Sequence, residues 1–218
     1  MDDIATSMRP RAGRPTREQA AARHNELLET ALDHFLDKGF EQATIEAIAH
    51  DVGMTKRTVY ARYPDKVSLF RAAVNLAIER YTVPQEVIEA TDQGDLEQTL
   101  IAVAWLRVEQ VLNPSGLKLQ RIINSESYRF PEIFEPFYRL ASQPTVRFLA
   151  ALLERETRAG RLAVAEPEKA ANVFMSMVVG GPVRAIVLAG PLPHLSRSEL
   201  EERTAFAVRL FLDGARPR

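Results

Sequence analysis

Apolar residues recur every three or four positions along nearly the whole chain, and no stretch shows the alternation of apolar and polar residues that is typical of strands. This spacing gives a helix one buried face, so the pattern predicts an all-α fold. No internal repeat is evident. Helices are predicted over about 17–38, then after Thr44, after Thr55 and after Asp65, and further along the chain over about 95–112, 115–128, 131–159, 167–189 and 197–213.

Cap and turn residues mark where the first helices begin and end. Thr16 and Gln19 have the spacing of a capping box, and Gly39 is a typical C-terminal stop. Thr55 is a candidate N-cap for the third helix. That helix must end by Tyr63, because the residue before a proline disfavours helical geometry.

The segment 44–63 has the layout of a helix-turn-helix, in which a short helix, a tight turn permitted by Gly53 and a second short helix follow one another. Ile48 would hold the first helix against a core, and Val59 and Tyr63 would hold the second. The opposite face of the second helix presents Lys56, Arg57, Thr58 and Tyr60.

These outward side chains are chemically suited to DNA. Lysine and arginine can donate to O6 and N7 of guanine, and threonine offers a methyl group or a hydroxyl. Tyr60 and Lys66 are better placed for phosphate, Lys66 because it opens a helix at the positive end of its dipole. The alternative is an ordinary solvated helix face. The predicted DNA contacts are Arg14, Thr44, Thr55, Lys56, Arg57, Thr58, Tyr60 and Lys66.

Charge supports this interpretation through its distribution. The net charge is −1, whereas many nucleic-acid binders are basic overall. Arginines nevertheless gather in residues 9–23, and cations gather again in 55–66. Phosphate binding needs a local positive surface rather than a basic whole. Residues 1–16, broken by proline and glycine, are predicted to be a mobile basic arm, with a disordered tail as the alternative; a DNA-binding domain is predicted over 17–80.

The second half is predicted to be a separate helical domain over 84–218, beyond a junction at residues 84–94. Pro144 and Pro182 fall inside helical stretches, where they favour kinks. The apolar run 173–189 is short for a membrane span and contains Arg184, so it indicates a buried helix. The acidic start lacks an apolar signal core, and together these features predict a cytoplasmic protein without a membrane partner.

Other classes of function find little support in the residues. Cysteine is absent, which excludes disulfides and thiolate metal sites. The four histidines have no close metal-ligand spacing, and there is no phosphate loop, nucleophile elbow or zinc-protease motif. We therefore expect neither metal nor cofactor nor enzymatic activity.

The head of the chain resembles the tetracycline-repressor (TetR) family over about residues 14–80. The resemblance is carried by Thr-Val-Tyr-Ala-Arg-Tyr-Pro-Asp-Lys at 58–66 and by the Phe35…Gly39-Phe40 end of the first helix. Arg62 stands where a histidine is common in that family. Tyr-Arg-Phe-Pro at 128–131 and Arg-Ala-Gly-Arg-Leu at 158–162 resemble one version of its regulatory domain, with lower specificity.

The resemblance implies an all-α homodimer in which a three-helix head is linked to a larger helical bundle for ligand binding and dimerisation. Two heads would read a near-palindromic operator with half-sites roughly 34–36 Å apart, or a multiple of that distance. The last two helices would form the dimer interface. Its candidate residues are Gly181, Ala185, Leu200, Thr204, Ala207, Val208 and Phe211.

The resemblance also implies a small-molecule pocket in the bundle, whose occupation would shift the two heads to a spacing that misfits the operator. The candidate ligand contacts are Trp105, Gln120, Phe130, Phe134, Phe137, Phe174 and Met177. Each of these side chains could equally serve as ordinary core. The function expected is a repressor released from DNA by a small hydrophobic ligand, with activation left open. A protein–protein module that has lost DNA binding, or a helical enzyme, are the alternatives.

Overall fold

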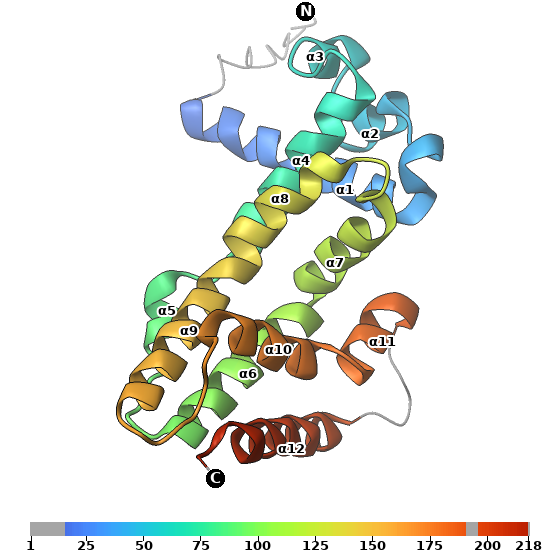
Figure 1. Ribbon diagram of the computed structural model, residues 1–218. Coiled ribbons are helices and arrows are strands. Elements are labelled where there is room, and N and C mark those ends of the chain that lie inside the picture. Colours follow the sequence, from blue (N-terminus) through green and yellow to red (C-terminus); the bar gives the residue numbers. More distant parts are fainter. Residues whose placement is uncertain (1–15, 191–195, 218) are drawn as a thin grey trace, which may run out of the picture.

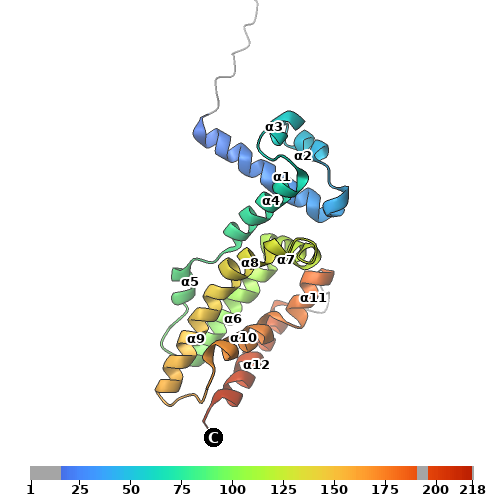
Figure 2. The same cartoon turned by 45° about the horizontal axis from the view of Figure 1, so that its top comes forward.

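A computed structural model of the chain describes residues 16–190 and 196–217 (Figures 1 and 2). Every regular element in these ranges is helical, which confirms the all-α prediction. The α-helices are α1 (Arg17–Gln42), α2 (Ile45–Asp51), α3 (Lys56–Tyr60), α4 (Lys66–Tyr81), α5 (Gln85–Glu89), α6 (Leu96–Leu112), α7 (Pro114–Glu126), α8 (Phe134–Phe137), α9 (Gln143–Arg158), α10 (Pro167–Val179), α11 (Pro182–Ala189) and α12 (Arg197–Ala215). A 3-10 turn η1 (Pro131–Ile133) precedes α8, and a π-helical turn η2 (Tyr138–Ser142) follows it.

Helices α1 to α3 and the start of α4 form one end of the molecule, and α12 lies at the other (Figure 1). Thr16 and Gln19 close the predicted capping box at the start of α1. Gly39 breaks α1 with a φ of 74°, but one further turn follows because Phe40 packs into the core beyond it. The first helix therefore ends four residues later than predicted, at Gln42.

The predicted helix over 131–159 is divided into η1, α8, η2 and α9. Pro144 has no N–H to donate to the carbonyl of Leu140, and the chain widens into the π-turn η2 just before it. The predicted helix over 167–189 is likewise two helices. Gly180 and Gly181 separate α10 from α11, and Gly181 has a φ of 54°. The junction at 84–94 contains the short helix α5.

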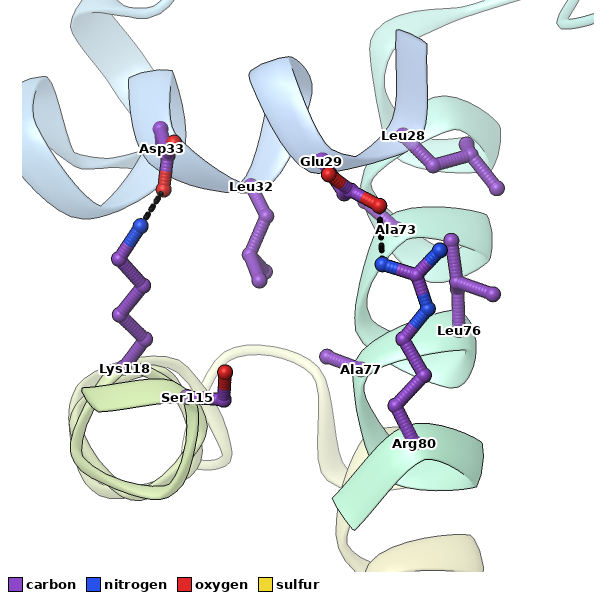
Figure 3. Close-up of a pocket in the computed structure, with 10 residues that line it drawn as sticks. All are labelled: Leu28, Glu29, Leu32, Asp33, Ala73, Leu76, Ala77, Arg80, Ser115 and Lys118. Carbon is purple, nitrogen blue, oxygen red and sulfur yellow. Dashed lines mark hydrogen bonds and ion pairs between the residues drawn. The ribbon is translucent and has the colours of Figure 1, made fainter. Parts of the chain in front are cut away.

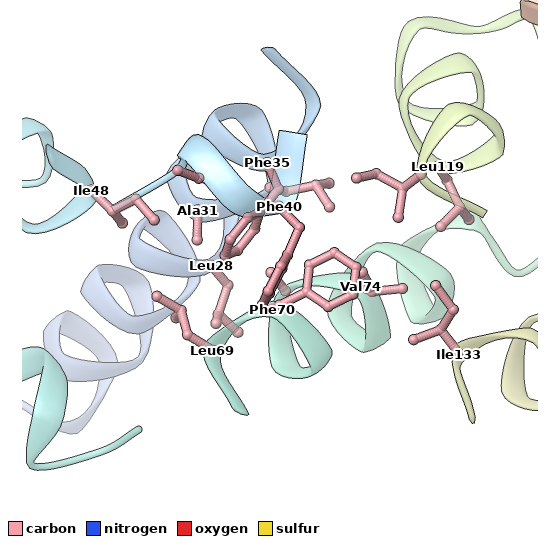
Figure 4. Close-up of a cluster of buried hydrophobic side chains, with 14 of the residues drawn as sticks. Leu28, Ala31, Phe35, Phe40, Ile48, Leu69, Phe70, Val74, Leu119 and Ile133 are labelled. Atoms are coloured by element: carbon pink, nitrogen blue, oxygen red, sulfur yellow. The ribbon is translucent and has the colours of Figure 1, made fainter. Parts of the chain in front are cut away.

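Two hydrophobic clusters hold the molecule together. The first joins α1–α4 to α7, and Figure 4 shows Phe40 and Phe70 in one cluster with Leu119 of α7 and Ile133 of η1. The second joins α6, α9, α10, α11 and α12. Helix α7 thus belongs by sequence to the second half but packs into the core of the head. The division into domains at residues 84–94 remains a prediction.

No single helix in the described ranges is long and apolar enough to cross a membrane. Helices α10 and α11 reach that length and composition together, but they are bent by 59° at the break between them. Val178, Val183 and Val187 of this pair are buried in the second cluster, as the prediction of a buried helix requires.

Candidate DNA interface and regulatory cavity

Helices α2 and α3 are joined by a tight turn in which Gly53 has a φ of 64°. Thr44 and Thr55 each cap one of these helices, since their hydroxyls accept from the backbone N–H groups of Ala47 and Thr58 at 3.2 and 3.1 Å. The hydroxyl of Thr55 also lies 2.8 Å from that of Thr58. Both threonines were predicted to contact DNA, and the structure gives them a capping role.

Helix α3 has one inward and one outward face. Val59 is fully buried in the first cluster, and the hydroxyl of Tyr63 lies 2.5 Å from Nε2 of His24 on α1. The side chains predicted to face DNA are all exposed: Lys56, Arg57, Thr58 and Tyr60. The helix ends at Tyr60, before the limit at Tyr63 that Pro64 predicts, and the chain turns before Pro64.

The two cations of α3 differ in their surroundings. Lys56 forms an ion pair with Glu46 of α2, which raises the pKa of Lys56, and its ammonium lies 5.5 Å from the ring centre of Tyr60. Within the part of the chain that the structure describes, the guanidinium of Arg57 has no ion pair, side-chain hydrogen bond or ring contact. Arg57 is therefore the cation of α3 that is free to meet an external group.

Lys66, which was predicted to contact phosphate, bonds within the chain. Its ammonium donates to the carbonyl oxygens of Glu41 and Ala43 at 2.9 and 3.1 Å and lies 4.6 Å from the ring centre of Phe40. The side chain points back to the end of α1 because those carbonyls have no helical donor. Lys66 thus closes the turn between α1 and α2. Arg14, also predicted to contact DNA, lies outside the described residues.

Sequence reasoning missed a carboxylate that joins α1 to α2. Asp51 accepts from Nε2 of His34 at 2.7 Å and from Nδ1 of His50 at 3.0 Å. The bond from His50, followed by that from His34, lowers the pKa of Asp51. His34 and Asp51 are far apart in sequence and follow no motif spacing, so no local signal could have paired them.

The residues predicted to bind a ligand do not form one site. Phe130 packs into the head, with ring centres 4.7 Å from Phe40 and 4.9 Å from Phe70. Phe174 is fully buried against Phe211 in the second cluster. Three further candidates also lie apart from one another. Phe134 is 49% exposed, and Met177 is half-buried on α10. The indole of Trp105 donates to Glu109 on the surface.

Gln120 and Phe137, the other two candidates, meet at a cavity of about 170 Å³ between α6, α7, α8, α10 and α11. Its remaining walls are Arg107, Val111, Asn124, Ser142, Val179, Arg184 and Val187. Arg107 was not predicted to line a cavity, because the sequence of an amphipathic helix does not indicate whether an arginine points inward or toward solvent.

The candidate dimer residues on α12 require a correction. Leu200, Thr204, Ala207 and Val208 are buried within the subunit itself, where α12 packs on α6 and α10, and Phe211 is half-buried there. They form the inner face of the helix because an amphipathic helix uses its larger apolar stripe for its own core. The outer face of α12 carries Phe206 and Leu210, which are 58% and 53% exposed. On α11, Gly181 is exposed and Ala185 half-buried.

Two family models match the chain. Residues 27–73 match "Bacterial regulatory proteins, tetR family", and residues 98–214 match "AefR-like transcriptional repressor, C-terminal domain". A helix-turn-helix-type transcriptional regulator of Mycobacterium tuberculosis is 31% identical over 101 residues, which are 46% of this chain and 47% of that protein. The chain thus matches about half the length of this curated relative.

Solved structures agree with this family over most of the chain. A TetR-family transcriptional regulator of Mesorhizobium loti is 24% identical with a TM-score of 0.74, covering 93% of this chain and 100% of that one. The flavonoid-responsive regulator FrrA is 29% identical with a TM-score of 0.68, covering 91% and 99%.

Proposed function

Since the chain belongs to the TetR family of bacterial regulatory proteins, we propose that it is a transcriptional repressor that binds a near-palindromic operator as a homodimer and is released by a small hydrophobic molecule. Such a protein acts in the cytoplasm, where its operator lies. The observation that carries the proposal is α3, whose Val59 is fully buried while Arg57 and Thr58 stand exposed. In a recognition helix, one face packs against the protein core and the opposite face is exposed to the major groove.

The contacts can be assigned by chemistry. Arg57 can form two hydrogen bonds with O6 and N7 of a guanine, and Thr58 can contact a thymine methyl. Tyr60 at the end of α3 suits phosphate. Lys56 would first have to leave Glu46, so Arg57 rather than Lys56 is the principal reader of sequence.

A near-palindromic operator is bound by two heads, so the protein must form a dimer. The outer face of α12 is suited to form the dimer interface. Phe206 and Leu210 are large exposed apolar side chains, and Leu188 of α11 is 60% exposed. Such side chains gathered on the final helices are costly to leave in water and suit a self-complementary interface.

Helix α7 is suited to couple the cavity to the head. Gln120 and Asn124 line the cavity, whereas Leu119 on the same helix is buried in the head core. Figure 3 shows the boundary beside it, where Lys118 of α7 pairs with Asp33 of α1 at 2.5 Å. A ligand that moves α7 would therefore shift the head, which is the two-state behaviour that release from DNA needs. The likeness to a flavonoid-responsive regulator supports a small-molecule effector.

Selection of duplexes from a random pool, using the purified chain, tests this proposal. An enriched inverted repeat bound with a steep dependence on salt is expected. The protein should sediment as a dimer, and Phe206→Glu as a monomer, while Val87→Glu on exposed α5 remains dimeric. Enrichment of no palindrome would instead favour the protein–protein module.

A further inference from the structure

Arg107 of α6 is a buried cation that forms no ion pair with any carboxylate of residues 16–190 and 196–217. Its side chain is part of a residue that is 4% exposed. Nη1 donates to the side-chain oxygen of Gln110 and to the carbonyl oxygen of Ala141, the latter at 2.9 Å, whereas Nε is buried and has no partner. Among the residues that the structure describes, no carboxylate forms an ion pair with it.

Glu156, another buried charged residue, shows which kind of partner Arg107 lacks among the described residues. Glu156 of α9 is also 4% exposed, and it is paired with both Arg155 and Arg161. A charge withdrawn from water is stabilised by an opposite charge and by hydrogen bonds that satisfy its donors or acceptors. Burial lowers the pKa of Arg107, but a guanidinium stays protonated at neutral pH. Arg107 therefore retains a charge that the protein itself leaves unbalanced.

The cavity described above provides the space for the missing anion. Arg107 lines it together with Arg184, and none of its described lining residues is acidic. Gln120, Asn124 and Ser142 add polar groups. The apolar walls come from Phe137 and three valines. A cavity of about 170 Å³ is close to the roughly 150 Å³ of an engineered cavity that binds benzene, so it has room for a ligand with one ring.

We propose that the effector is a small organic carboxylate with a single ring or a branched chain of that size, which pairs its carboxylate with the guanidinium of Arg107 and packs its apolar body against Phe137. This rests on the proposed function of the chain as a ligand-responsive regulator. Arginine suits the role because its planar fork of donors matches the two oxygens of a carboxylate.

The same contacts lead toward the head. Gln110, which accepts from Arg107, donates to the backbone carbonyl of Tyr81, the last residue of α4. Gln120 at the cavity donates to the hydroxyl of Tyr81 at 3.2 Å. A carboxylate on Arg107 would compete with Gln110 for the guanidinium and so loosen one of the two hydrogen bonds that hold the end of α4.

Calorimetric titration of the full chain, without DNA, tests this inference. The probes are benzoate and cyclohexanecarboxylate, each compared with its neutral amide of nearly the same shape. Because the amide cannot pair with the guanidinium, each acid should bind at least about tenfold more tightly than its amide. Equal binding of acid and amide, or binding of neither acid, would overturn the inference, and this comparison needs no variant.

Arg107→Gln keeps hydrogen-bonding capacity but removes the charge, so it should bind acid and amide alike. Arg147→Gln makes the same change on the exposed face of α9 and should keep the preference. Retention of the preference by a folded Arg107→Gln would contradict the assignment of Arg107. Operator binding is measured separately. A chain that prefers carboxylates yet binds no operator refutes the proposed function alone, and a chain that binds its operator without this preference refutes the inference alone.

Discussion

The head and the regulatory half place an arginine in opposite environments. Arg57 stands exposed on a short helix whose other side is buried, whereas Arg107 is enclosed by helices that leave one side of it open to a cavity. In the head, the apolar residues of α3 pack into the core, and the exposed cation remains available to bind DNA. In the regulatory half a cation lies in the interior, where no carboxylate of the described residues forms an ion pair with it. An exposed cation such as Arg57 therefore serves binding at little cost in folding stability. A buried cation such as Arg107 lowers the folding stability of the ligand-free protein.

The largest expected effect concerns the boundary between these regions. Phe130 belongs to the second half but is 8% exposed and packs on Phe40 and Phe70 of the head. Phe130→Ala should therefore lower the free energy of unfolding by about 3–5 kcal/mol, as other buried phenylalanines do. Phe134→Ala, four residues on and 49% exposed, is the matched control and should cost less than about 1 kcal/mol. Urea denaturation measures both, and equal losses would show that the head does not depend on this boundary.

The exposed arginine should matter for DNA and not for stability. Arg57→Ala should weaken operator binding by about 1–3 kcal/mol per half-site and relax the preference at one base pair. Lys56→Ala should have the smaller effect, because Lys56 is already paired with Glu46. Fluorescence anisotropy against the selected operator and single-base variants measures the ranking. The reverse order, with Lys56 dominant, would show that the pair with Glu46 opens on DNA.

The buried charges should respond with opposite signs. Arg107→Met removes an uncompensated charge, so the ligand-free protein should gain between nothing and about 2 kcal/mol of stability. Glu156→Gln removes the charge of a buried carboxylate that is paired with Arg155 and Arg161, and should cost about 1–2 kcal/mol. Denaturation in urea compares the two variants. If Arg107→Met lost as much stability as Glu156→Gln, Arg107 would be a structural residue rather than one held ready for a ligand.

The sequence predicted most of the helices of the head because local signals specify them. Thr16, Thr44, Thr55 and Asp65 all cap the helices that follow them, and each cap depends on residues within three positions. The exposed face of α3 was predictable for the same reason, since the helical period fixes which side Val59 occupies.

The orientation of the other side chains depended on which helices pack against each other. Lys66 was assigned to phosphate from its place at a helix start, but it reaches back to carbonyls at the end of α1. Leu200 and Val208 of α12 are core because α6 and α10 lie beneath them. Arg107 of α6 donates to the carbonyl oxygen of Ala141 in η2, 34 residues later in the chain, and lines a cavity built from several helices. Such pairings are tertiary, and helical periodicity carries no information about them.

The smallest effect expected is a pH dependence in the head. Because hydrogen bonds from His50 and His34 lower the pKa of Asp51, the folded state favours its ionised form. That stabilisation is complete above the ordinary pKa of about 4 and is lost as the pH falls through the lowered value. The melting temperature of the wild type should thus exceed that of Asp51→Asn at neutral pH, and the difference should close in acid. Asp37→Asn, which removes an exposed carboxylate of α1 that has no ion pair among the described residues, is the matched control for the loss of a charge from the head. A gap between wild type and Asp51→Asn that persists unchanged in acid would mean that Asp51 joins α1 to α2 by shape rather than by charge.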